Sequence, residues 1–151
     1  MAEPLQEIEQ ELVLIARHTL AVNPGGRVRL LDRSAYQLLS RMRVQGPMSI
    51  GQLAEAFGLD TSTVNRQSSA MLRAGLVERI PDPEGGIARK LRITEFGAAQ
   101  LALDREHSVE GLGRVLADWS PQQIEDLRET LVRFNTSIER VEGRPWPRAD
   151  R

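Results

Sequence analysis

Apolar side chains recur at helical spacing near both ends of the chain. The first stripe runs from Leu5 to Ile15 in steps of three and four residues, and the Asn-Pro-Gly-Gly sequence at 23–26 ends that helix. Later stripes predict a long fifth helix capped by Thr94 and a sixth helix opened by the Ser-Pro-Gln-Gln sequence at 120–123. Three long amphipathic helices cannot bury such stripes on one small lobe, so the pattern requires a further packing surface.

Between these helices the predicted elements are shorter. Three helices are followed by a hairpin with a turn-rich tip at 81–86, which predicts a mainly α fold with a small β-hairpin wing, a winged helix–turn–helix. The core positions predicted for the second helix are Ala35, Leu38, Leu39 and Met42. The predicted elements are a helix capped by Asp32 and stopped by Gly46-Pro47, a helix capped by Ser49, a helix over about 61–74, and strands over 76–80 and 88–93.

The stretch LAEAFGLDTSTVNR, residues 53–66, has the spacing of a helix–turn–helix. Ala54 supplies a small side chain where the second helix crosses the first, and Gly58 accepts the positive φ of the turn. Val64 provides the apolar anchor of the second helix. Inside the order helix, helix, helix, hairpin, this spacing strongly indicates a DNA-binding lobe.

The second helix of this unit begins with hydroxyl side chains, which cap helices more readily than they fill them. Val64, Ser68 and Met71 can face the core together with Leu72, which leaves a polar edge with no acidic residue between Thr61 and Val77. Such an edge is typical of a recognition helix, in which an arginine can fork onto guanine and an asparagine can pair with adenine. The candidate DNA-binding residues on it are Thr61, Ser62, Thr63, Asn65, Arg66, Ser69 and Arg73.

A structural explanation of the hydroxyl cluster stays open, in which these side chains only cap and solvate an exposed helix and Arg66 extends over it. The hairpin that follows favours DNA binding, because we expect no core-forming role for a hairpin at that place. It resembles a wing, whose tip would contact the DNA backbone or the minor groove.

The composition is that of a soluble globular protein, with 151 residues, 27% charged residues, a net charge of −1 and a pI near 6.2. No global basic field points to nucleic acid, so a DNA interface has to be local. The absence of cysteine excludes disulfides, thiolate zinc sites, a cysteine nucleophile and thiol redox sensing.

We expect neither a metal nor a cofactor, because His18 and His107 lie far apart with no ligand cluster at metal-binding spacing. We also expect no membrane span, since no apolar run approaches the ~18 residues that one needs. The acidic N-terminus is unlike a signal peptide, which predicts a cytoplasmic protein.

The sequences SIGQLAEAFGLDTSTVNRQSSAMLRAGLVERIPDP and RKLRITEFG resemble the MarR family of winged-helix transcriptional regulators. The resemblance covers nearly the whole chain, since one helix precedes this part and two follow it. AGLVER and ITEFG fit the Gly-Leu-Val that leads into the family's wing and the Thr-x-x-Gly that follows it. The resemblance implies a homodimer whose first, fifth and sixth helices interlock, with two recognition helices in successive major grooves of a pseudo-palindromic double-stranded DNA operator.

The wing departs from the family pattern. Asp82-Pro83 is present, but Gly85-Gly86-Ile87 replaces the Asp-Arg-Arg stretch whose arginine reaches the minor groove in the family. Arg89 and Lys90 follow shortly afterwards and are the candidate wing contacts. Two alternatives stay open, namely that Arg89 substitutes for the missing arginine or that the wing reads DNA weakly.

The resemblance also implies a small-molecule effector, because the family commonly binds aromatic or lipophilic molecules between the dimer helices and the DNA-binding lobe. Such a pocket would draw on the first, second and fifth helices, where His18, Tyr36 and Met42 are candidates by position. A packing role is the alternative for each of the three.

The sequence is therefore interpreted as a cytoplasmic, homodimeric, sequence-specific DNA-binding regulator, a repressor released by a small lipophilic or aromatic ligand. The rival is a winged helix that docks proteins, which the neutral pI and the altered wing permit. Catalysis is the weakest option, since no nucleophile pairs with a base and the carboxylates are expected on solvent faces. The expected organisation is an N-terminal dimerisation helix and linker at 1–30, the DNA-binding lobe at 31–94, C-terminal dimerisation helices at 95–142 and a flexible tail at 143–151.

Overall fold

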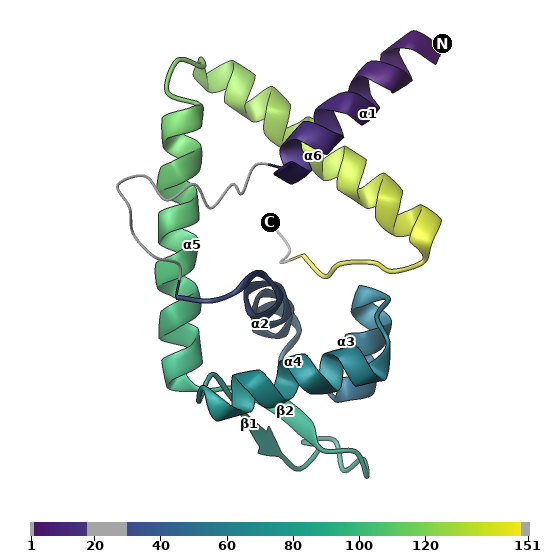
Figure 1. Cartoon of the computed structure of the whole chain (residues 1–151), viewed down its shortest axis with the longest axis vertical. Helices are drawn as coiled ribbons and strands as arrows, with labels where there is room; N and C mark the ends of the chain where they lie inside the picture. Colours follow the sequence, from purple (N-terminus) through teal and green to yellow (C-terminus); the bar gives the residue numbers. More distant parts are fainter. Residues whose placement is uncertain (1, 18–29, 149–151) are drawn as a thin grey trace.

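The computed structural model describes residues 2–17 and 30–148. Within these ranges six helices and one two-stranded sheet follow in the predicted order, and α5 connects a winged helix–turn–helix lobe at one end of the molecule with α6 at the other (Figure 1). The lobe consists of α2, α3, α4, β1 and β2. The elements are α1 (Ala2–Arg17), α2 (Arg33–Gln45), α3 (Ile50–Phe57), α4 (Thr61–Arg73), β1 (Val77–Ile80), β2 (Lys90–Ile93), α5 (Glu95–Val115) and α6 (Pro121–Glu142).

Four helices begin at the caps that the sequence predicted. Each cap side chain accepts a hydrogen bond from the amide three residues further on, at 2.8–3.2 Å, which satisfies one of the free donors of the first turn. Glutamine side chains return a hydrogen bond to the two serine caps and complete capping boxes. The four caps are Asp32, Ser49, Thr94 and Ser120.

The helix–turn–helix packs as its spacing predicted. Ala54 is buried at the crossing of α3 and α4, and Val64 is fully buried. Gly58 ends α3 in the left-handed region at φ +62°, which is the conformation that the turn requires. The predicted core positions of α2 are also buried, so these two expectations are confirmed.

The hairpin is antiparallel, but each strand is shorter than predicted. Leu76 lies outside β1 because its amide closes α4 by donating to the carbonyl of Met71 at 3.0 Å. At the other end Pro81 has no N–H to donate, so the ladder stops at Ile80 and residues 88–89 stay outside β2.

A third short segment, which the sequence did not reveal, joins the sheet at its base. Met48 and Leu91 form an isolated antiparallel bridge, with Leu91 N donating to Met48 O at 2.8 Å and Met48 N to Leu91 O at 3.1 Å. Met48, Leu91 and Val77 are all buried. The base of the hairpin therefore belongs to the core, and the expectation that the hairpin has no core-forming role was wrong.

The start of α5 lies in close contact with the end of α4. Thr94 Oγ1 donates to the carbonyl of Gly75 at 2.6 Å and also accepts from the amide of Gly97. A Cβ atom at Gly97 would lie only 2.1 Å from the carbonyl oxygen of Leu76. This close approach gives a physical reason for the Thr-x-x-Gly sequence after the wing.

A buried carboxylate on α5 holds the beginning of the lobe. Asp104 is 1% exposed, and its Oδ2 and Oδ1 atoms accept from the amides of Leu31 and Leu30 at 2.8 and 3.1 Å. It shares the buried face of α5 with Leu101 and Gly111. The expectation that carboxylates lie on solvent faces is therefore wrong for Asp104, which links two segments far apart in sequence.

The C-terminal segment, residues 144–148, differs from the expected flexible tail. Trp146 is half-buried, and its ring lies edge-on to Phe57 of α3 with 5.7 Å between the ring centroids. Burial of these two aromatic rings against each other brings the segment back onto the lobe. Residues 149–151 lie outside the described residues.

Apolar side chains on α1 and α6 stay exposed among the residues that the structure describes. No residue of α6 is buried, and residues 3–17 of α1 are all exposed. Among the large exposed apolar side chains are Leu5, Ile8, Leu12, Ile15, Ile124, Leu131, Phe134 and Val141. The packing surface that the sequence required is thus not supplied by the lobe.

The Asp104 contact predicts a specific loss of stability. In Asp104→Asn, one carboxylate oxygen becomes an NH2 group, so one of the two backbone amides at Leu30 and Leu31 would face a donor in place of its acceptor. We expect the free energy of unfolding in urea to fall by about 1–3 kcal/mol. Asp118→Asn, the same change at an exposed position near the end of α5, is the control and should stay within about 0.5 kcal/mol of the parent. Equal stability of the two variants would contradict the role of Asp104.

Candidate nucleic-acid interface

The predicted recognition residues share one edge of α4. Val64, Ser68 and Met71 are buried against the lobe, which turns the opposite edge of the helix outward. Thr63 and Ser69 are half-buried at its margin. The exposed members of this α4 edge are Thr61, Ser62, Asn65, Arg66 and Arg73.

The α4 edge carries two positive charges without ion-pair partners among the described residues. Arg66 and Arg73 are exposed, and neither forms an ion pair with any residue of 2–17 or 30–148. Both guanidinium groups therefore keep their planar set of donors, the geometry that binds guanine or phosphate in a bidentate manner.

Asp60, which the sequence analysis did not single out, begins α4 as its N-cap. Its side chain makes no capping hydrogen bond, and the residue is exposed. A carboxylate at this position offsets the positive end of the helix dipole. The positive potential of the α4 edge therefore comes from Arg66 and Arg73 rather than from the helix N-terminus.

Two of the four basic side chains on the wing are already paired. Lys90 Nζ lies 3.5 Å from the carboxylate of Asp82, with both side chains largely covered. Arg92 forms hydrogen bonds to Glu78, its cross-strand partner. Of the two predicted wing contacts, only Arg89 is both exposed and without an ion-pair partner in the part of the chain that the structure describes.

Two further features of the wing bear on an interface. Arg79 on β1 is exposed and, like Arg89, has no ion-pair partner among the described residues, although the sequence analysis did not select it. Ile87 is fully exposed, at 106% of its reference area. The tip thus offers an apolar side chain where the family pattern has an arginine, and Arg79 before it and Arg89 after it have no ion-pair partner in the described part of the chain.

The structure describes two of the three candidate effector residues, Tyr36 and Met42. Met42 is 2% exposed in the core of the lobe, and Tyr36 is partly buried against that core. His18 lies outside the described residues. Packing, the alternative considered for all three, is the role that the structure gives to Met42 and Tyr36.

Comparison with known proteins identifies the family. The MarR family model matches residues 31–85, from the start of the lobe to the tip of the wing. Over 136 residues the chain is 35% identical to the HTH-type transcriptional regulator YxaD of Bacillus subtilis (strain 168), covering 89% of this chain and 95% of the relative. The chain belongs to the MarR family.

Solved structures share the fold of this MarR protein. A MarR family protein from Bacillus stearothermophilus has a TM-score of 0.76 at 21% identity, covering 91% of this chain and 97% of that chain. A structure named MarR gives 0.75 at 20% identity, with 89% and 92% covered. The organohalide-sensing regulator RdhR-CbdbA1625 in its 2,4-dichlorophenol-bound form gives 0.63 at 16% identity, with 86% and 79% covered.

The MarR protein is a transcriptional regulator, and regulators of this family bind DNA and often act as dimers. The protein-docking alternative is not favoured by these relationships. Within residues 2–17 and 30–148, no three acidic or histidine side chains gather in a group that fits a metal ion. None of the helices in the same ranges has the length and hydropathy needed to cross a bilayer.

The turn at the wing tip lowers the pKa of the Asp82 carboxyl group. The pKa of its carboxyl lies below the ordinary value, chiefly because the Glu84 amide donates to it at 2.9 Å and to a smaller extent because Lys90 lies nearby. A lowered folded-state pKa stabilises the turn above about pH 4, and this contribution is lost as pH falls through the folded-state pKa. In a carboxyl NMR titration we expect a low midpoint for Asp82, raised part of the way in Lys90→Gln. A midpoint at or above the ordinary value would contradict the turn geometry.

Proposed function

We propose that this MarR regulator is a homodimer that reads double-stranded DNA with the α4 edge in the major groove and the wing against the backbone or minor groove. The observation that carries the proposal is the acid-free α4 edge, on which Arg66 and Arg73 are exposed and unpaired among the described residues. Base edges in the major groove provide the donor and acceptor pattern that such side chains discriminate.

Each candidate residue has a place in this proposal. Arg66 would fork onto a guanine, and Asn65 would pair with an adenine. The hydroxyl groups near the start of α4 and on Ser69 would bind base edges or phosphate, and Arg73 would bind the backbone further along the groove. Arg89 would reach the minor groove or a phosphate, whereas Lys90 would act through Asp82 to hold the wing turn.

Dimer formation would cover the exposed apolar faces of the long helices. Residues 1–30 and 95–142 would form the dimerisation part and residues 31–94 the DNA-binding lobe. Burial of apolar side chains on α1 and α6 would supply the driving force, at about 25 cal/mol for each Å² removed from water. Two lobes related by a twofold axis would then match a pseudo-palindromic operator.

We further propose that the protein is a repressor and that a small lipophilic or aromatic ligand releases it from DNA. A structural relative was solved with 2,4-dichlorophenol bound, which supports an aromatic ligand by analogy. A cavity of about 660 Å³ between α2, α3, α6 and the C-terminal segment has the size of a small-molecule site and includes Phe57, Ile138 and Trp146 in its walls.

Removal of the Arg66 guanidinium tests direct readout. After a preferred duplex is selected from a random pool, Arg66→Ala should weaken binding to it by about 1–3 kcal/mol if the side chain is bidentate to guanine. The measurement is a titration by fluorescence anisotropy at a fixed, stated salt concentration, because phosphate contacts make affinity strongly salt-dependent.

Two comparisons make this test specific. Arg66→Lys keeps the charge but loses the fork, so it should lose discrimination while keeping much of the affinity for random-sequence duplexes. An equal loss on preferred and random duplexes would mean that Arg66 contacts only phosphate. No loss on either duplex would place the interface elsewhere.

The wing is tested by the salt dependence of binding. Arg89→Ala should reduce the slope of log K against log salt by about 0.9 for each phosphate contact that is lost. Arg133→Ala on α6 is the matched control, since it removes the same charge from an exposed arginine that has no ion-pair partner within residues 2–17 and 30–148. An Arg89→Ala slope equal to that of the control would exclude a backbone contact by Arg89.

A further inference from the structure

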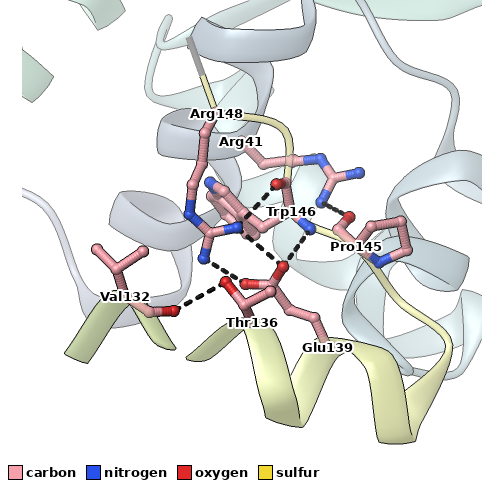
Figure 2. Close-up of polar contacts among 7 residues, drawn as sticks. All are labelled: Arg41, Val132, Thr136, Glu139, Pro145, Trp146 and Arg148. Atoms are coloured by element: carbon pink, nitrogen blue, oxygen red, sulfur yellow. Dashed lines mark hydrogen bonds and ion pairs between the residues drawn. The ribbon is translucent and has the colours of Figure 1, made fainter. Parts of the chain in front are cut away.

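The C-terminal segment joins α6 to the lobe through Trp146. Its ring lies edge-on to Phe57 of α3, at an interplanar angle of 88°, and the Arg41 guanidinium of α2 lies 5.0 Å from its centroid. Arg41 Nη1 also donates to the carbonyl of Pro145 at 3.3 Å. Figure 2 shows Trp146 between Arg41 and the end of α6. The Trp146 side chain therefore contacts both α2 and α3.

Glu139 of α6 holds the other side of the segment. Its carboxylate accepts from the Trp146 amide at 3.2 Å and from both terminal nitrogens of Arg148, with Arg148 Nη1 at 2.9 Å (Figure 2). The hydrogen bond from Arg148 is the main reason that the pKa of Glu139 lies below its ordinary value. The Trp146 backbone and the Arg148 side chain are thus held by α6, while the Trp146 ring contacts the lobe.

Arg41 is buried and held in place by its contacts. It is 9% exposed, its Nε donates to Gln45 at 2.8 Å, and burial lowers its pKa while Glu139 partly offsets that effect. Arginine remains charged despite such burial. A buried guanidinium needs partners, and the Trp146 face and the Pro145 carbonyl supply two of them.

These contacts connect the lobe to α6 by a second route, in addition to the connection through α5. The lobe is attached to the N-terminal part of α5, whereas α6 leaves from its other end, about 30 Å away for a helix of 21 residues. Gly111 and Gly113 lie in the distal part of α5, where glycine weakens a helix. In Figure 1 the segment after α6 runs back toward α2, so the lobe is held from two directions.

We propose that Trp146 is a positioning residue that fixes the orientation of α4 relative to α6, and hence the half-site spacing that the dimer accepts. The proposal rests on the DNA-binding function proposed above. The observation behind it is that the described contacts of residues 144–148 place one aromatic ring on α2 and α3 and its own amide on α6. Fixing α4 before DNA arrives reduces the cost of ordering the two lobes on binding.

A distance measurement tests the orientation without DNA. The chain has no cysteine, so Arg73→Cys on α4 and Arg133→Cys on α6 can carry the only two spin labels. Labelled chain diluted about tenfold with unlabelled chain reports the distance within one protomer. We expect one narrow distribution in the parent, at least a twofold broadening with Trp146→Ala, and recovery of the narrow distribution with Trp146→Phe, which keeps a ring on Phe57 and Arg41.

Trp119→Ala is the matched control. Trp119 is exposed at the turn between α5 and α6, so its removal should leave the distribution unchanged. If Trp146→Ala does not fold, Arg148→Gln replaces it, because that change loosens the exposed side of the segment and leaves the rings intact. A distribution as narrow in the loosened variant as in Trp119→Ala overturns the proposal.

A binding measurement connects the orientation to DNA. Cysteine-free chains are titrated with duplexes that carry two preferred half-sites at spacings varied by single base pairs. The parent and Trp119→Ala should prefer one spacing, whereas Trp146→Ala should bind that duplex about tenfold more weakly and lose the preference, with affinity for random duplexes unchanged. An unaltered spacing preference in Trp146→Ala overturns the proposal. If the parent binds no duplex, the proposed DNA-binding function fails, and the distance measurement still decides whether Trp146 orients α4.

Discussion

The hydrogen bonds that Asp104 accepts from two backbone amides determine where the DNA-binding lobe begins. Both carboxylate oxygens are buried and have no ion-pair partner among the described residues. The hydrogen bonds from the amides of Leu30 and Leu31 therefore replace those that the carboxylate would make with water. The backbone just before α2 therefore has one favourable position on α5. The start of α2 is fixed relative to α5 by that position, because a buried polar contact of this kind tolerates few alternatives.

The distribution of charge explains how a nearly neutral protein can have a local basic surface. On the wing and on α6, several bases are paired with acids, as in Lys90 with Asp82 and Arg128 with Glu125. On α4 there is no acid, and the described residues leave its two arginines unpaired. Overall pI averages over these regions, so it carries little information about any one face. What matters for an approaching polyanion is the local excess on the α4 edge.

How much of the structure the sequence predicts depends on how far apart the interacting residues lie. Caps were predictable because donor and acceptor are three residues apart, and the buried positions of α2 and α4 followed from helical spacing. The Asp104 contact spans 73 residues and the contact of Arg41 with Pro145 spans 104, so neither leaves a local pattern. For the same reason the sequence could mark Lys90 as basic but could not show that Asp82 pairs with it. The α4 edge was predictable as a surface, whereas its partners on DNA remain a proposal.

The two attachments of the lobe differ in how readily they can change. The Asp104 carboxylate is buried. If it separated from the amides of Leu30 and Leu31, all three groups would lose their hydrogen-bond partners, and the buried carboxylate would have no water to replace them. The pair between Glu139 and Arg148 lies nearer to solvent, where water can replace each partner at small cost. Any ligand that alters the orientation of α4 must favour one arrangement over another by differential binding. Breaking the contact between Glu139 and Arg148 therefore costs less free energy than breaking the contacts of Asp104, so a change in the orientation of α4 is expected to begin at the C-terminal segment.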